Sequence, residues 1–134
     1  MKKILSLLTA MIAIAVLFTA CSKSPDKVLD RKDGKWDAII TNTISIDGSE
    51  EERYVEVATF IFDDNKFTAI SSAGESETGT WSASKDQVTL VIDGDALVLD
   101  VLKSNKKDQE WQSIEKENYQ GMIVEYKTNI KLSR

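Results

Sequence analysis

Residues 79–102 alternate between apolar and polar or smaller side chains with a period of two, and this pattern constrains the fold more than any other feature of the chain. A period of two places alternate side chains on opposite faces of a pleated strand, whereas a helix repeats every 3.6 residues. An Asp-Gly pair separates two of the alternating runs and is a strong hairpin signal, because glycine accepts a positive φ. One face of this hairpin carries Val88, Leu90, Ile92, Leu97, Leu99 and Val101.

The same unit recurs from Lys35 to Leu132 and predicts eight strands. Their expected ranges are 35–44, 53–62, 66–71, 77–83, 87–92, 95–103, 108–114 and 121–132, with an acidic loop at 47–52 and a turn at 115–120. All the connections are short, and no helical period separates the strands. These features predict an all-β domain at residues 34–134, an eight-stranded antiparallel up-and-down barrel, since closure removes exposed strand edges. A β-sandwich is the alternative.

The residue types present exclude several kinds of chemistry. The chain has no histidine and a single cysteine, so it lacks the usual nucleophile–histidine pairs, multi-cysteine metal motifs and intrachain disulfides. Asp63-Asp64-Asn65 and Asp93-Gly94-Asp95 lack the spaced ligands of a calcium loop and are typical of hairpin turns. We therefore expect no catalytic residues, no metal and no cofactor.

The charge of the chain indicates which partners to expect. The net charge is −5, and without Lys2 and Lys3 the remaining 15 basic residues face 22 acidic residues, a net charge of −7. Basic residues such as Lys103, Lys106 and Lys107 are interleaved with acidic residues along the sequence. This distribution argues against a nucleic-acid partner and against electrostatic docking to anionic lipid headgroups.

The first 20 residues have the organisation of a secretory signal. Lys2 and Lys3 form a positive start, residues 4–18 are apolar, and Thr19-Ala20 supplies small residues before Cys21. This apolar stretch is too short and wrongly flanked for a transmembrane helix. A buried N-terminal helix is the alternative.

The sequence Phe18-Thr19-Ala20-Cys21 resembles the lipobox of bacterial lipoproteins. The resemblance implies cleavage before Cys21 and attachment of acyl chains such as palmitate at this residue, and several chains anchor a protein durably. Ser22 resembles the residue found in lipoproteins sent to the outer membrane. The expectation is a lipid-anchored protein of the bacterial cell envelope, at the outer membrane and facing the periplasm. Residues 21–33 would form its lipidated N-terminus and tether, with one helical turn after Pro25.

Three segments of the folded domain resemble the small lipocalin-like domains of envelope lipoproteins from Bacteroidetes-type bacteria. They are Gly34-Lys35-Trp36, the run from Phe60 to Phe67 (FIFDDNKF), and Gly79-Thr80-Trp81. The resemblance implies a barrel whose cavity takes a small apolar or amphipathic molecule. The candidate ligand-binding residues are Trp36, Phe60, Phe62, Trp81, Trp111 and Tyr126. The alternative is that these aromatic side chains fill the barrel.

Two functions remain open at this stage. The leading hypothesis is noncatalytic binding of a small hydrophobic ligand by a membrane-anchored protein. The alternative is a protein-interaction or inhibitor module with a filled barrel, which would bind an unknown partner through the hairpin loops at 47–52 or 104–108. If Phe60 and Phe62 point inward, so does Glu56, which we expect at the rim of the barrel, because burying an unpaired carboxylate is costly. A polar contact of Glu56 with a ligand is the other possibility.

Overall fold

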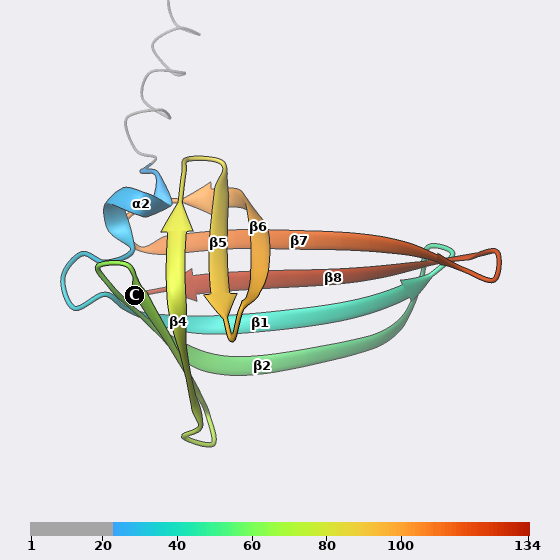
Figure 1. The fold of residues 1–134 in the computed structure, drawn as a ribbon, viewed down its shortest axis with the longest axis horizontal. Coiled ribbons are helices and arrows are strands. Elements are labelled where there is room, and N and C mark those ends of the chain that lie inside the picture. Colours follow the sequence, from blue (N-terminus) through green and yellow to red (C-terminus); the bar gives the residue numbers. More distant parts are fainter. Residues whose placement is uncertain (1–22) are drawn as a thin grey trace, which may run out of the picture.

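The computed structural model describes residues 23–134, so the expected signal segment and Cys21 lie outside the described residues. Residues 23–134 contain one helical turn and eight strands. They are α2 (Pro25–Val28), β1 (Lys35–Ile46), β2 (Ser49–Asp63), β3 (Lys66–Ser71), β4 (Ser76–Ala83), β5 (Gln87–Ile92), β6 (Asp95–Ser104), β7 (Asp108–Tyr119) and β8 (Met122–Ser133). Each strand pairs with the next in antiparallel fashion, and β8 pairs with β1 to close a barrel. The predicted all-β up-and-down barrel is confirmed (Figure 1).

The turns form as the residue types predict. Asp93 and Gly94 both have positive φ, 52° and 82°, which matches the right-handed twist of the two strands they join. Asp47 and Gly48 adopt the same conformation, with φ of 49° and 83°. Two-residue turns of this kind set the register of each hairpin, so the alternating apolar residues reach the same face of the sheet.

Two Gly-x-Trp segments place tryptophans in the interior. A Cβ atom on Gly34 would lie 1.9 Å from the carbonyl oxygen of Phe62, and one on Gly79 would lie 1.9 Å from that of Val91. Only a residue without a side chain permits these approaches. In each segment the tryptophan two residues later, Trp36 or Trp81, is buried.

The hydrophobic core occupies one end of the barrel. Its buried members are Leu29, Trp36, Ala38, Phe60, Phe62, Phe67, Trp81, Val88, Leu90, Leu99, Trp111, Ile130 and Leu132. Most of them come from the first half of β1, the second half of β2, the first half of β7, the end of β8 and the short strands between. The closed part of the barrel is therefore the part that contains all eight strands.

The remaining halves of four strands leave the barrel as a separate four-stranded sheet. We call residues 42–46, 49–54, 113–119 and 122–128 the sheet extension; its strand order is β2-β1-β8-β7. Neighbouring β3 pairs only with residues 58–63 of β2, and β6 only with residues 109–112 of β7. In Figure 1 the four long strands run past β4, β5 and β6 to two hairpin tips. At about 3.3 Å per residue, the extension is roughly 20 Å long.

The extension corrects two sequence expectations. Residues 49–52 and 115–119, predicted as loop and turn, are strand, because Glu52 pairs with Ile44 and Glu117 with Val124. The acidic run at residues 50–52 is typical of a solvated loop. In a sheet with water on both faces, however, backbone hydrogen bonds to β1 and β8 are sufficient to hold charged residues in a strand.

The segment before the barrel packs against its closed end. The predicted helical turn after Pro25 is confirmed as α2, and both Val28 and Leu29 are buried. The indole nitrogen of Trp36 donates a hydrogen bond to the carbonyl oxygen of Leu29 over 2.9 Å. From Pro25 onward, the stretch expected as a tether therefore covers the closed end of the barrel.

Candidate functional site

Five of the six candidate ligand-binding residues belong to the buried core. Phe62 lies at its centre, with ring centroids 5.2 Å from Trp81, 5.4 Å from Phe67 and 6.2 Å from Trp111. Phe60 packs edge-on against Phe67 at 5.0 Å. These separations are those of favourable aromatic contacts. The structure thus gives these five side chains aromatic or apolar partners from the protein itself.

The three tryptophans differ in their polar contacts. Trp36 donates to Leu29, and the Nε1 of Trp111 donates to the side-chain oxygen of the buried Gln109 over 3.2 Å. Among residues 23–134, the buried Nε1 of Trp81 has no hydrogen-bond partner. Two of the three indoles are therefore held in a defined orientation by the core.

Tyr126, the sixth candidate, does not join the core. It lies on β8 in the sheet extension, opposite Ile44 of β1, and is 42% exposed. The register places it on the same face as the buried Ile130, four residues further along the strand. Tyr126 therefore marks a surface that continues the barrel interior into solvent, which we call the inner face of the extension.

The inner face carries large apolar and aromatic side chains. Strand pairing places Ile44, Tyr54, Tyr119, Met122, Val124 and Tyr126 on it. Tyr54 is 55% exposed and Tyr119 is 62% exposed. The outer face of the extension also exposes apolar residues, among them Val55, Ile114 and Ile123, so the inner face is distinguished by its three tyrosines. A group of exposed aromatic side chains on one face is typical of an interaction site, whereas single exposed apolar residues are ordinary.

A layer of polar side chains, which we call the polar level, separates the inner face from the core and consists of Asn42, Ser113 and Thr128. Thr128 donates a hydrogen bond to the side-chain oxygen of Asn42 over 2.9 Å, and Ser113 pairs with Thr128 on the neighbouring strand. Glu56 lies next to this level and is exposed, as the rim position requires. The barrel interior therefore ends at Asn42 and Thr128, and the surface beyond them is open to water.

The inner face is acidic. Four glutamates lie on it or at its root, Glu52, Glu56, Glu115 and Glu117, and the register places no lysine or arginine on this face. The opposite, outer face of the extension carries Arg53, Lys116 and Lys127. The outer face also carries Glu50, which pairs with Arg53, and Glu125, which lies opposite Lys116, so its charge is mixed whereas the inner face carries acidic residues alone.

Hydrogen bonds fix side chains on the inner face and join the two hairpin tips of the extension. The hydroxyl of Tyr54 donates to Glu52 over 2.8 Å, and this bond together with the Glu52 charge raises the pKa of Tyr54 above its usual range. At the tip, the backbone N–H of Ile123 donates to the carboxylate of Asp47 over 3.0 Å, and the N–H of Asp47 donates to the carbonyl of Ile123 over 2.9 Å. The β1–β2 turn is thus tied to β8.

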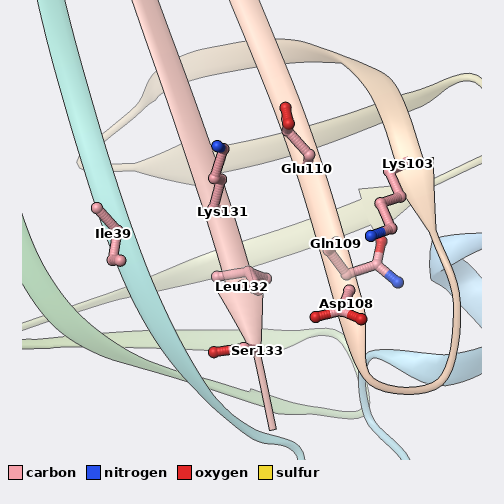
Figure 2. Close-up of a pocket in the computed structure, with 8 residues that line it drawn as sticks. All are labelled: Ile39, Lys103, Asp108, Gln109, Glu110, Lys131, Leu132 and Ser133. Carbon is pink, nitrogen blue, oxygen red and sulfur yellow. The ribbon is translucent and has the colours of Figure 1, made fainter.

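A hollow of about 290 Å³ lies elsewhere, on the outside of the barrel. Figure 2 shows that it crosses β1, β8 and β7, with Ile39, Lys131 and Glu110 on successive strands. Lys103 and Lys131 are balanced there by Asp108 and Glu110. This hollow is shallow and its lining has both positive and negative charges, so it does not indicate which kind of ligand would bind there.

Within residues 23–134, no group of three acidic or cysteine side chains is placed to hold a metal ion. No helix in the same range combines the length and the apolar character needed to cross a bilayer.

Comparison of the chain with protein-family models, with curated proteins and with solved structures gave no match. The class is therefore defined by the fold alone: a small eight-stranded antiparallel up-and-down β-barrel. Its distinguishing feature is the sheet extension, whose inner face is both acidic and aromatic.

Sequence reasoning missed two surfaces. The inner face could have been found by continuing the alternation of β7 through residues 113–119, where Glu115, Glu117 and Tyr119 fall on one face. The basic residues, interpreted above as interleaved with acids, are in fact gathered in space at the closed end, where seven of them surround one hollow. They come from three distant segments, so no local pattern reveals them.

Proposed function

We propose that this protein is a noncatalytic, lipid-anchored interaction protein of the cell envelope, and that the inner face of its extension binds a basic amphipathic segment of a partner protein. The observation that carries the proposal is the contrast between the two parts of the barrel. The closed end is packed with Phe60, Phe62 and Trp111, whereas the inner face exposes tyrosines beside glutamates. The hypothesis of a ligand in the barrel interior has less support, because the core aromatics already contact one another.

Charge complementarity identifies the kind of partner. A segment with lysine or arginine on one side and apolar residues on the other would pair with Glu52, Glu115 and Glu117 and cover Tyr54 and Tyr126. Such pairing steers the encounter and fixes the orientation of the partner, while the aromatic side chains supply most of the binding free energy.

A second copy of the chain fits this surface poorly. Two inner faces placed together would oppose four glutamates with four others, and repulsion between like charges disfavours that contact. The unpaired edges of the extension carry Glu51, Arg53 and Lys116, and charged edge residues discourage pairing between sheets. The proposed partner is therefore a different protein.

The proposed anchor is consistent with this use of the extension. The chain enters the barrel at α2, at the closed end, and the two hairpin tips lie at the opposite end (Figure 1). Acyl chains on Cys21 would hold the closed end near the membrane and direct the extension away from it. Cys21→Ser is expected to release the protein from the membrane fraction; unchanged fractionation would contradict the anchor.

Site-specific photo-crosslinking in intact cells tests the proposed surface. A photoreactive phenylalanine is placed at Tyr54 or Tyr126 on the inner face and, as the control, at Val55 or Ile123 on the outer face. We expect both inner-face positions to capture the same protein, which mass spectrometry identifies. The double variant Glu52→Lys/Glu117→Lys should lower its capture at least about fivefold, whereas Glu125→Lys on the outer face should change it less than about twofold.

Other results would replace the proposal. Equal capture from both faces, or capture of the chain by itself, would remove the inner face as the specific site. A small molecule retained by the gently purified protein in native mass spectrometry, combined with no inner-face crosslink, would favour ligand carriage instead.

A further inference from the structure

A hollow of about 540 Å³ lies at the closed end of the barrel, and its lining is almost entirely cationic. It is formed by Val28 and by seven basic residues: Lys23, Lys27, Arg31, Lys32, Lys106, Lys107 and Arg134. No acidic residue is among them. We call this hollow the basic pocket; its volume is within the range of small-molecule sites.

The basic pocket is assembled from three parts of the chain. Residues 23–32 come from the segment around α2, Lys106 and Lys107 from the turn between β6 and β7, and Arg134 follows β8. Backbone hydrogen bonds join these parts: the N–H of Lys23 donates to the carbonyl of Ser104 over 3.2 Å, and the N–H of Arg134 to that of Lys107 over 3.1 Å. These hydrogen bonds connect the backbones of the three segments that carry the cations; we call the connected segments the frame.

Arg134 holds the frame together through its side chain. Its Nη2, Nη1 and Nε donate to the carbonyl oxygens of Val28, Arg31 and Lys106 over 3.0, 3.0 and 2.9 Å. Burial lowers the pKa of this guanidinium, and the nearby Asp33 carboxylate opposes the change; an arginine stays charged at neutral pH. Arg134 therefore contributes a fixed positive charge and three structural contacts.

The protein balances the charge of the pocket only in part, through carboxylates such as Asp33 near Arg134. Among residues 23–134 the ion pair found joins Arg53 and Glu50, on the extension, and none of the seven pocket cations takes part in an ion pair. The chain as a whole is acidic, with a net charge of −5. Seven cations gathered on an acidic protein repel one another, so an anion that bound among them would relieve the repulsion.

We propose that the basic pocket binds a phosphate-bearing group. Lysine and arginine side chains offer only hydrogen-bond donors, and they are the residues that recognise phosphate oxygens. The pocket is larger than a bare phosphate requires, so it has room for the group to which the phosphate is attached. Val28, buried against its floor, gives that group one apolar contact.

Two sources can supply this chemistry: the headgroup of an anionic phospholipid, or a free phosphorylated compound. Lys23 is the second residue after Cys21, so an anchored protein would hold the pocket beside the membrane surface. The lipid source rests on the proposed anchor, whereas the phosphate site itself does not. It is also independent of the inner face, which lies at the other end of the molecule.

Amide chemical shifts of the full chain in nonionic detergent micelles test the site. The titrants are inorganic pyrophosphate, short-chain phosphatidylglycerol and, as a zwitterionic control, short-chain phosphatidylcholine. We expect pyrophosphate or phosphatidylglycerol to shift amides in residues 27–32 and 105–107, and phosphatidylcholine to act more weakly. The double variant Lys106→Gln/Lys107→Gln should weaken binding about tenfold or more, while Lys103→Gln/Lys131→Gln, an equal loss of charge outside the pocket, should change it less than about twofold.

The three titrants distinguish a lipid headgroup from a free phosphorylated compound. Binding of phosphatidylglycerol without pyrophosphate assigns the site to a lipid headgroup, and binding of pyrophosphate alone assigns it to a soluble phosphorylated compound; binding of both shows that phosphate is sufficient. The proposal is overturned if no titrant shifts the pocket amides, or if the two double variants weaken binding equally. Crosslinking at the inner face is a separate result, so either proposal can fail alone.

Discussion

The guanidinium carbon of Arg134 lies 3.9 Å from the centre of the Trp36 ring. The contact joins the residue after the last strand to the first tryptophan of the first strand. The same Trp36 donates its indole N–H to Leu29, and the same Arg134 donates to the carbonyl of Val28. The closed end of the barrel is therefore held by one pair of side chains that both bind the segment around α2.

Replacing Arg134 should loosen this end of the barrel. Arg134→Ala removes three hydrogen bonds to carbonyl oxygens and the cation–π contact, and we expect a loss of about 2 kcal/mol in the free energy of unfolding. Arg134→Lys should recover only a small part, because one ammonium group cannot reach three carbonyls in a planar arrangement. Urea unfolding measures both. Full recovery by lysine would show that charge alone matters.

The two indoles Trp36 and Trp81 form a matched pair. Both are buried, but only the Trp36 Nε1 has an acceptor within residues 23–134. Each Trp→Phe change removes a similar volume, and Trp36→Phe also leaves the Leu29 carbonyl without its partner. We therefore expect Trp36→Phe to cost about 1–2 kcal/mol more than Trp81→Phe. Equal costs in urea unfolding would mean that the indole bond does not hold the helical turn.

Gly34 and Gly48 both have positive φ, but only Gly34 is tightly enclosed. A Cβ at Gly34 would meet the Phe62 carbonyl oxygen at 1.9 Å, while one at Gly48 meets nothing within 4 Å. Gly48→Ala should cost about 1 kcal/mol from backbone strain alone. Gly34→Ala must separate β1 from β2 and should cost more than about 3 kcal/mol or prevent folding. Thermal unfolding followed by far-UV circular dichroism compares them; similar midpoints would contradict the close approach.

The centre of the core should be the most sensitive position in the barrel. Phe62 contacts the aromatic rings of four neighbours, so Phe62→Ala should cost about 3–5 kcal/mol through lost burial and the cavity that it leaves. Tyr54→Ala, a comparable truncation on the exposed inner face, should stay within about 0.5 kcal/mol. Denaturant unfolding tests the contrast. A small effect of Phe62→Ala would indicate a loosely filled interior.

The strand count and the closure of the barrel could be predicted from sequence because both depend on local signals. Val88, Leu90 and Ile92 alternate, and Asp93-Gly94 supplies the turn, so neighbouring strands specify their own pairing. The helical turn after Pro25 could also be predicted, because it depends only on neighbouring residues in the chain. The interior positions of Trp36 and Trp81 were indicated only by the resemblance of their Gly-x-Trp segments to lipocalin-like domains.

The extension and the basic pocket depended on tertiary structure. Glu117 is a strand residue only because Val124 lies beside it, and no local propensity indicates how far a hairpin continues past the core. Lys107 and Arg134 meet through the pairing of β7 with β8, and Lys27 joins them only when β1 closes against β8. Alternation and turn residues act between neighbours in the chain, so the sequence by itself determined a barrel; its charged surfaces arise from long-range closure, and only the folded structure decided them.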